Sequence, residues 1–328
     1  MIRRRAFTFA AAFTIASLAS LAAAGWVQAE ELPRKAITLV VGFAPGGAAD
    51  SSARIIARKL SENLGQSVLV QNRDGAGGNI AHQYVANAEP DGSVILLGSI
   101  GPLAIAPQLM KVGYDPQRDL APLTMGMAFP DVLVVPASLG VKTLAQYVAL
   151  ARSRPGAIDF ASSGTGSATH LAGELFNARA GVDTVHIPYK GGAPAMNDLI
   201  AGRVASFYSS PLSALPHIAS HKLVALATTG LQRTALMPNV PTVAESGYPG
   251  FEAVNWYAFV APGKTPPAVL DRWNLELVKA LESPDVREEL TRHGLMPMPG
   301  TRAGLASYIA AESRTWGELI KERNIRAQ

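Results

Sequence analysis

Strand-like and helix-like patterns alternate along the first hundred residues. Ile37–Val41 is an uninterrupted run of β-branched and apolar residues, which is typical of a strand covered on both faces. A helical pattern follows from about Ala48 to Asn63, and Gly65 marks its end. Two further strand-like runs, Ser67–Gln71 and Val94–Ser99, lie on either side of another helical segment. This alternation predicts a parallel sheet with helices on both faces.

The middle of the chain shows a second series of the same kind. Its expected strands are Asp131–Pro136, Ile158–Ala161, Thr184–Pro188, Val204–Tyr208 and Leu223–Thr228. The last third contains three amphipathic helical patterns, at Pro266–Glu282, Asp285–His293 and Gly304–Lys321. A strand-like run at Trp256–Pro262 could carry the chain back to the first series. Two separate series favour two α/β lobes over one very wide sheet.

The amino-terminal residues have the pattern of an export signal. A basic start, Met1–Arg5, precedes an apolar stretch, and Val27–Ala29 has the small-x-small pattern of a cleavage site. We expect residues 1–29 to be removed near Ala29/Glu30, which places the mature protein in the periplasm. A membrane-anchoring helix fits less well, because the apolar stretch is rich in alanine and ends at this triplet. Arg4-Arg5 leaves ordinary secretion and twin-arginine export both open.

Removal of the signal changes what the charge implies. The chain has 29 Lys and Arg against 25 Asp and Glu, a net charge of +4. Three of those basic residues, Arg3 to Arg5, leave with the signal, so the mature chain is near +1. This charge gives no reason to expect nucleic acid or acidic membranes as partners. The absence of cysteine excludes disulfides, a thiolate nucleophile and a Cys-ligated metal site.

Four loops share one design, in which a strand end is followed by Gly or Ser and then by a helix start. They are Phe43–Asp50, Ser162–His170, Tyr189–Pro194 and Ser209–Ser213. Each alone is most simply a tight connection. Together they are more informative, because ligands of open α/β sheets bind beyond the carboxyl ends of the strands. Free backbone N–H groups at helix starts suit a carboxylate or a phosphate. We expect the first two loops to face each other across a cleft and hold one small carboxylate.

The polar side chains of these loops each allow two interpretations. Asp50 can stabilise its helix dipole or contact a ligand amino group. Ser162, Ser163 and Ser167 can cap a helix or donate hydroxyls to a carboxylate, and we favour donation. His170 is most simply a hydrogen-bonded structural histidine.

Other kinds of site fit the sequence poorly. No phosphate-binding Gly-x-x-x-x-Gly-Lys-Ser/Thr stretch occurs, and Gly75–Ile80 has Ile80 where a dinucleotide loop requires a small residue. The histidines lack metal-ligand spacing, and no Gly-x-Ser-x-Gly elbow is present. We therefore expect no metal, no cofactor and no catalytic residues. A triad scattered through the sequence stays open, with Ser163 or Ser167 and His170 as its candidates.

At this point the motifs resemble those of one family, the extracytoplasmic solute receptors of the tripartite tricarboxylate transporter type, also called Bug proteins. The similar segments cover most of the mature chain: 37–50, 64–72, 75–80, 90–92, 114–116, 161–171, 186–191, 213–218 and 238–245. The resemblance implies a type II periplasmic-binding-protein fold, with two α/β lobes and a ligand cleft between them. It implies one lobe from residues 30–127 and 256–328 and the other from 128–255.

The same resemblance implies a ligand and its contacts. The ligand would be a di- or tricarboxylate, an acidic amino acid or an aromatic acid, held by N–H groups and hydroxyls. From the first lobe the implied contacts are Phe43, Ala44, Gly46, Gly47, Asp50 and Ser99. From the second lobe they are Ser162, Ser163, Gly164, Thr165, Gly166, Ser167, His170, Tyr189, Lys190, Gly191 and Ser209. Ser209 stands where the family often has Asp or Asn, a difference that could change the preferred ligand.

Three functions therefore stay open at this stage. The first is a monomeric receptor that closes around its ligand and delivers it to a two-subunit membrane permease. The second is a secreted hydrolase or isomerase that uses the same cleft. The third is a partner that presents the ligand to a sensory membrane receptor.

Overall fold

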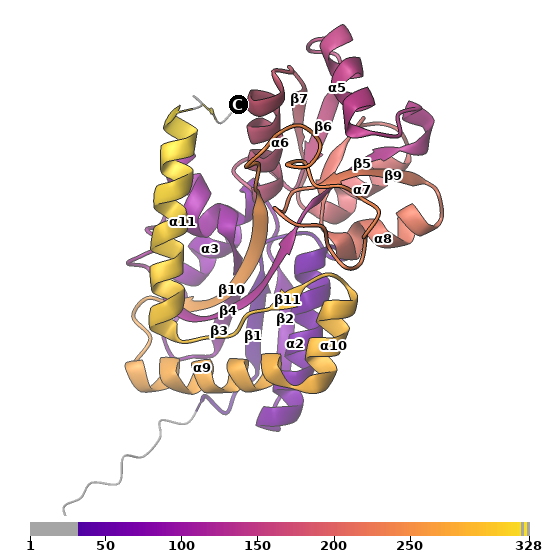
Figure 1. Ribbon diagram of the computed structural model, residues 1–328. Helices are drawn as coiled ribbons and strands as arrows, with labels where there is room; N and C mark the ends of the chain where they lie inside the picture. Colours follow the sequence, from indigo (N-terminus) through magenta and orange to yellow (C-terminus); the bar gives the residue numbers. More distant parts are fainter. Residues whose placement is uncertain (1–31, 323–324, 327–328) are drawn as a thin grey trace, which may run out of the picture. The chain divides into compact units, whose positions relative to one another are not determined.

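The computed structural model describes residues 32–322 and 325–326, and these residues form two β-sheets with their helices (Figure 1). The expected signal peptide lies outside the described residues. Both sheets belong to the unit Leu32–Gln328. Among the residues described, we find no helix with the length and apolarity needed to cross a lipid bilayer.

The first sheet has six strands in the order β11-β4-β10-β3-β1-β2. They are β1 (Ile37–Val41), β2 (Val68–Asn72), β3 (Val94–Ser99), β4 (Leu120–Pro130), β10 (Val254–Pro262) and β11 (Met296–Pro297). β1 pairs in parallel with β2 and β3, as its buried pattern predicted. β10 runs antiparallel to β3 and β4, so the sheet is mixed and the expectation of a parallel sheet holds only for its first three strands.

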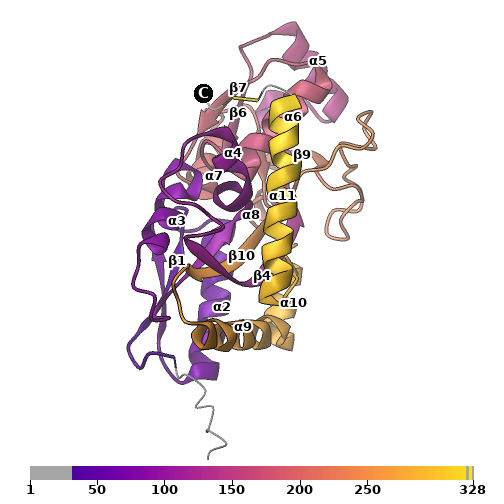
Figure 2. The same ribbon diagram turned by 90° about the vertical axis from the view of Figure 1, so that its left-hand side faces the viewer.

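Helices cover both faces of this sheet because neighbouring residues of a strand point in opposite directions. The helices are α2 (Ala48–Leu64), α3 (Asn79–Ala86), α9 (Pro267–Glu282), α10 (Pro284–Arg292) and α11 (Arg302–Glu322), with short turns η1 (Ala76–Gly78), η2 (Gly101–Ile105) and α4 (Ala106–Leu109). α2, α9 and α10 pack against one another beside this sheet (Figure 1), and Leu39 and Val41 belong to the core that they share. Val40 packs in the opposite core with α3 and α11, and α11 lies against β4, α4 and η2 (Figure 2).

The second sheet has five strands in the order β7-β6-β8-β5-β9. They are β5 (Val132–Pro136), β6 (Asp159–Ser162), β7 (Val185–Pro188), β8 (Phe207–Ser209) and β9 (Leu223–Thr228). Its helices are α5 (Leu144–Ser153), α6 (Ala168–Ala180), α7 (Gly192–Ile200) and α8 (Pro211–Ala219), with the turn η3 (Ala137–Leu139). β6 is parallel to β7 and β8, whereas β5 is antiparallel to β8 and β9. We call the elements of the six-stranded sheet lobe 1 and those of the five-stranded sheet lobe 2.

The chain passes between the lobes at two places that lie side by side. Asp131 alone separates β4 from β5, and residues 229–253 lead from β9 back to β10. Thr229 joins the two passages: its hydroxyl accepts a hydrogen bond from the N–H of Asp131 (2.8 Å) and donates one to the carbonyl of Ala253 (2.6 Å). The crossing strands β4 and β10 pair along most of their length, with two register shifts. These contacts form the floor beneath the space between the lobes.

Candidate functional site

A small cavity of about 40 Å³ lies between the two lobes, large enough for about three water molecules. Its lining residues come from both lobes and from both crossings: Phe43, Gly47, Ala48, Ala49, Asp131, Ser163, Thr169, Gly192, Phe207, Ser209, Ser210, Ser213, Asn255 and Tyr257. None of them is Lys, Arg or His. An anion in this cavity would therefore be held by backbone N–H groups and hydroxyls.

Two of the four helices whose first turns contribute lining residues begin at glycine and have no side-chain cap. Gly47 is the N-cap of α2 and Gly191 is the N-cap of α7. The first N–H groups of a helix have no acceptor within the helix, so these two first turns keep donors available for a ligand. The two helix starts are close together, because a Cβ atom on Gly47 would stand 3.6 Å from the backbone nitrogen of Ala193 and 3.8 Å from that of Gly192.

The other two helices begin at a serine that caps them. The hydroxyl of Ser167 accepts a hydrogen bond from the N–H of His170 at the start of α6 (3.3 Å). The hydroxyl of Ser210 accepts one from the N–H of Ser213 at the start of α8 (3.3 Å). Each cap satisfies one donor that the helix itself leaves free. Ser167 therefore acts as a cap, whereas Ser163 and Ser209 line the cavity itself.

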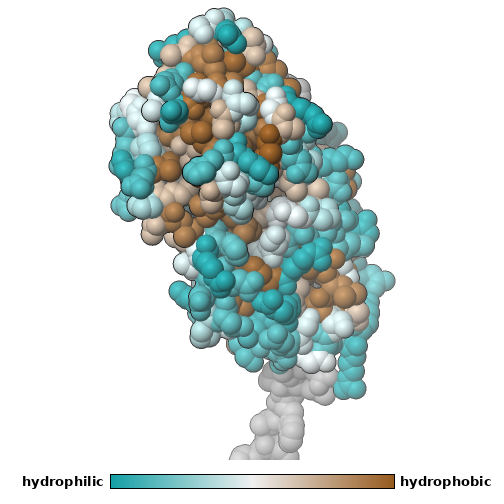
Figure 3. Space-filling view, turned by 90° about the vertical axis from the view of Figure 1, so that its right-hand side faces the viewer, coloured by the Kyte–Doolittle hydropathy of each residue, from teal (hydrophilic) through white to brown (hydrophobic). Residues whose placement is uncertain are grey.

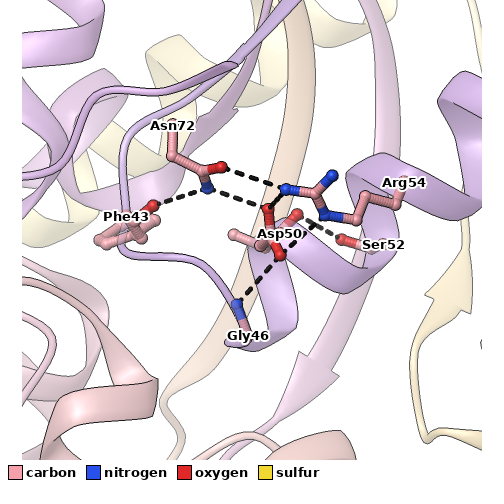
Figure 4. A network of polar contacts seen from close by, with 7 residues as sticks. Phe43, Gly46, Asp50, Ser52, Arg54 and Asn72 are labelled. Atoms are coloured by element: carbon pink, nitrogen blue, oxygen red, sulfur yellow. Dashed lines mark hydrogen bonds and ion pairs between the residues drawn. The ribbon is translucent and has the colours of Figure 1, made fainter. Parts of the chain in front are cut away.

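The Asp50 carboxylate holds the loop of lobe 1 in place (Figure 4). It accepts hydrogen bonds from the N–H of Gly46 (3.0 Å), from both ends of the Arg54 guanidinium (3.0 and 2.8 Å) and from the Asn72 amide (2.9 Å). The same amide also donates to the carbonyl of Phe43 (3.0 Å). Burial alone would raise the pKa of Asp50, but the bonds from Arg54, Gly46 and Asn72 lower it below its usual range. Asp50 does not line the cavity, so it shapes the loop that does.

The two lobes touch through backbone atoms on both sides of the cavity. The N–H of Ala44 donates to the carbonyl of Lys190 across the lobes (3.0 Å). Gly101 faces Gly166 so closely that a Cβ atom on Gly101 would stand 2.7 Å from its carbonyl oxygen. A Cβ atom on Gly77 would likewise clash with the backbone carbonyl of Thr165, and the φ of 63° at Gly77 also favours glycine. The structure therefore shows the lobes in contact, with glycines where the backbones meet.

Most of the other expected contact residues lie beside the cavity and do not line it. Ala44, Gly164, Thr165, Gly166, Lys190 and Gly191 belong to the loops where the lobes meet. Tyr189 points to α7, where its hydroxyl donates to Asp198 (2.8 Å). Ser99 is buried at the end of β3. The prediction of these residues as ligand contacts stays a prediction.

Two buried histidines stack on each other behind the Ser162 loop. The rings of His170 and His186 are 4.0 Å apart. The N–H of Gly166 donates to Nδ1 of His170 (3.2 Å), so the proton of that ring belongs on Nε2. Burial lowers the pKa of His170 to about 3 and that of His186 to about 4, and His186 contributes to the lower value of its neighbour. Both rings are therefore neutral at neutral pH.

In the part of the chain that the structure describes, neither Ser163 nor Ser167 places its hydroxyl against the ring of His170. The hydroxyls of Ser163 and Ser167 each lie 3.1 Å from that of Thr169, and His170 directs Nδ1 at Gly166. Among the described residues, the serine hydroxyl bonded to a histidine ring is that of Ser162, 2.6 Å from Nε2 of His186. Ser162 is fully buried and does not line the cavity. This pair supports the loop.

Ten of the lining residues were not named individually as ligand contacts from the sequence: Ala48, Ala49, Asp131, Thr169, Gly192, Phe207, Ser210, Ser213, Asn255 and Tyr257. Six of them, Ala48, Ala49, Thr169, Gly192, Ser210 and Ser213, lie within the four loops that the sequence singled out. Asp131 and Asn255 had no such signal, because they lie on the two crossings.

A second hollow is larger but differs in character. It measures about 560 Å³ and is lined mainly by residues 230–236, with Met296 and Thr291 beside them. Leu231, Leu236 and Met296 are exposed apolar residues in this lining. Figure 3 shows that apolar groups interrupt the polar surface on the side of the molecule that it views. None of the described residues that line this hollow belongs to the first turn of a helix, so the smaller cavity is the better candidate for binding an anion. No group of His, Asp or Glu in the described part of the chain could hold a metal ion.

The fold and the site together define a two-lobe solute-binding protein with the type II periplasmic-binding-protein architecture. A model of the tripartite tricarboxylate transporter receptor family matches residues 52–325. The protein BugT of Bordetella pertussis is 39% identical over 307 residues, which cover 93% of this chain and 94% of BugT. A protein from Pseudomonas sp. strain P51, described by its place between tcbD and tcbE, is 42% identical over 91% of this chain and 89% of its own length. The chain belongs to the tripartite tricarboxylate transporter receptor family.

Solved structures agree with this assignment. The Rhodopseudomonas palustris protein Rpa4515, solved with adipate, superposes with a TM-score of 0.87 at 34% identity, covering 90% of this chain and 99% of that one. The periplasmic binding protein BugD gives a TM-score of 0.87 at 33% identity, covering 90% and 100%. MatC of the same Rhodopseudomonas species, with bound malate, gives 0.84 at 30% identity, covering 88% and 99%. The family and the fold that the motifs suggested are confirmed.

Proposed function

We propose that this solute-binding protein captures a small organic carboxylate by closing its lobes around it. The observation that carries the proposal is the pair of uncapped helix starts, α2 from lobe 1 and α7 from lobe 2, which meet at the cavity. Each helix start has a partial positive charge and free N–H donors. The adipate and malate bound by Rpa4515 and MatC are carboxylates, which supports the same ligand class here.

Lobe closure follows from the division of the site between the lobes. A carboxylate held by α2 alone gains half of the donors, and the other half comes only when α7 arrives. The ligand therefore favours the closed arrangement and shifts the population toward it. Water is excluded as the lobes meet, which strengthens the N–H contacts. Because the cavity is small, a ligand of several carbons would enter when the lobes are apart.

Thermal unfolding with a panel of solutes tests the ligand class. The panel contains succinate, malate, adipate, citrate, glutamate and benzoate, with glucose and putrescine as controls that carry no carboxylate. A ligand present at about 100 times its Kd should stabilise the protein by about 2.7 kcal/mol. We expect at least one acid to raise Tm and neither control to do so. A shift with glucose or putrescine and with none of the acids would overturn the proposal.

The rest of the role extends this proposal. We propose export to the periplasm with removal of residues 1–29, delivery of the ligand to a two-subunit membrane permease, and no catalytic turnover. Family membership supports delivery, and the described residues that line the cavity include no histidine, which supports binding without turnover. We also propose the lobe boundaries 30–127, 128–255 and 256–328; the division of strands between the two sheets supports them to within three residues, because β4 continues to Pro130 and β10 begins at Val254. Recovery of the bound acid unchanged after long incubation would separate a receptor from a hydrolase.

A further inference from the structure

One carboxyl group at the floor of the cavity has no partner. Asp131 is 1% exposed, and neither of its oxygens has a hydrogen-bond partner among the residues that the structure describes. Its backbone is well held, since the N–H of Asp131 donates to Thr229 and its carbonyl accepts from the N–H of Thr229 (2.9 Å). The side chain therefore lies where no described residue is in hydrogen-bond geometry with either oxygen, although the Asn255 amide is near enough to lower its pKa. A buried polar group of this kind is costly unless a ligand completes it.

A second acceptor lines the same floor. Asn255, on the other crossing, also lines the cavity, and its side-chain oxygen is buried without a partner. The floor thus offers the two oxygens of Asp131 and the amide oxygen of Asn255. Acceptors in this number require donors, and no Lys, Arg or His among the lining residues can supply them. A ligand ammonium group has three N–H donors and a positive charge, which fits this need.

We propose that Asp131 and Asn255 bind a protonated amine on the ligand, so that this receptor selects carboxylates that also carry an amine. The inference rests on the proposed carboxylate-binding function, because it assigns the carboxylate end to the starts of α2 and α7 and the amine end to the crossings. The ligand class is then a zwitterionic amino acid or amino diacid, and plain diacids are disfavoured. Asp131 is the residue that determines this specificity.

The protonation of Asp131 makes the selection measurable. Burial raises the pKa of the Asp131 carboxyl to about 8, and the Asn255 amide opposes part of this rise. Tyr257, on β10, is the other titratable group that lines the cavity, and burial together with Asp131 raises its pKa above its usual range. The lining residues from α2, α6, α7 and α8 include no charged side chain. Asp131 is therefore the group in this cavity that titrates near neutral pH.

The sign of the pH effect depends on the ligand. An ammonium group binds the ionised carboxylate, so binding releases a proton from Asp131 below pH 8. Affinity for an amino acid should rise about tenfold between pH 6 and pH 7 and level off above pH 8. A plain diacid binds beside the neutral acid, so its affinity should fall above pH 8. The ligand's own carboxylates stay ionised throughout this range.

Matched pairs of ligands test the proposal by isothermal titration calorimetry. The pairs are succinate with aspartate, glutarate with glutamate, and butyrate with 4-aminobutyrate. In the wild-type protein we expect the amine-bearing member of at least one pair to bind ten or more times tighter. Asp131→Asn keeps the size of the side chain and removes its charge, so it should abolish this preference. Asp183→Asn, at an exposed position outside the cavity, is the control that should retain it.

The outcomes separate the inference from the function on which it rests. Tighter binding of the plain acid in every pair that binds would overturn the inference and leave the carboxylate receptor intact. Failure of every acid, with and without an amine, would overturn both. If Asp131→Asn does not fold, the paired ligands and the proton release measured on the wild-type protein still test the proposal. Titration at pH 6.5 in buffers of different ionisation enthalpy should show release of about one proton with the amino acid, and proton uptake or no change would contradict the proposal.

Discussion

The four helices that begin at the cavity form two pairs. In one pair a serine side chain accepts a hydrogen bond from an N–H group of the first turn, and in the other pair no side chain does. α6 and α8 begin at Ser167 and Ser210, which cap them. α2 and α7 begin at Gly47 and Gly191, which have no side chain that could cap a helix. A glycine N-cap is only a few tenths of a kcal/mol worse than a serine, so the protein loses little stability by leaving these donors free. The capped pair shapes lobe 2, and the uncapped pair, one helix from each lobe, is left for the ligand.

A side-chain cap added to α2 should have the largest effect on ligand binding, because it would make an uncapped helix resemble the capped pair. Gly47 has an extended backbone (φ −86°, ψ 176°), and a Cβ atom there would make only ordinary contacts, so Gly47→Asp fits without strain. Its carboxylate would take the donors meant for the ligand and repel an incoming anion. We expect calorimetry to show at least about a hundredfold loss of carboxylate affinity, about 2.7 kcal/mol, with Tm unchanged or raised. Gly47→Ala is the control, and it should bind far better than the aspartate variant.

A substitution that prevents the two lobes from closing, and so keeps the starts of α2 and α7 apart, should have the next largest effect on ligand affinity. Gly101 meets Gly166 across the lobes and does not have a left-handed backbone, so Gly101→Ala adds a clash to the closed arrangement without local strain. Overpacking of this kind costs about 1–3 kcal/mol, so affinity should fall roughly tenfold to a hundredfold. Tm of the free protein should change little, because opening the lobes relieves the contact. Gly300→Ala, where nothing lies within 4 Å, is the matched control. Equal affinity in both variants would contradict closure as the binding step.

The hydrogen bonds of Asp50 hold the loop that precedes the uncapped helix α2, so their loss should reduce the stability of the protein as well as its affinity. Removing Asp50 leaves Arg54 and Asn72 without their shared partner, so Asp50→Ala should destabilise the protein by about 1–3 kcal/mol and weaken binding through a looser loop. The pKa of Asp50 is lowered in the folded state, so its contribution is present above its unfolded pKa, near 4, and is lost as pH falls through the folded value. Chemical denaturation at pH 7 and pH 3 checks this. A variant that is equally destabilised at both values would contradict the assignment.

The smallest expected effects separate a cap from a ligand contact. Ser167→Ala removes the cap of α6, so it should reduce stability by about 0.5–2 kcal/mol and leave affinity nearly unchanged. Ser163→Ala removes a hydroxyl that lines the cavity, so it should reduce affinity more than stability. Denaturation and calorimetry on the two variants measure both quantities. The reverse pattern would show that the capped helix start contacts the ligand.

The sequence anticipated the parts of this site that depend on local structure. Strands that end in Gly or Ser before a helix start have a strong local pattern, and Phe43, Gly47, Ser163 and Ser209 from those loops do line the cavity. β4 was missed because it contains Pro122, Gly126 and Pro130, residues that argue against a strand. In the structure Pro122 pairs with Val260, beside a register shift, where the ladder is already irregular.

Long-range pairing explains what the sequence could not supply. β5 runs antiparallel to β8 and β9, and its direct connection to β4 of the other sheet was not anticipated. Asp131 and Asn255 come to the same cavity only because the two crossings lie side by side. The interpretation of Asp50 also needed the fold, because its partner Asn72 lies at the end of the neighbouring strand.

A crystal structure with the best-binding acid of the panel tests directly whether the uncapped starts of α2 and α7 hold the ligand carboxylate. We expect one ligand carboxylate with its oxygens about 2.7–3.2 Å from backbone nitrogens in the first turns of α2 and α7, at Ala48, Ala49, Gly192 or Ala193. We also expect closed lobes, with the Ser167 and Ser210 caps still in place. A carboxylate bound elsewhere, with the first turns of α2 and α7 left to water, would contradict this expectation.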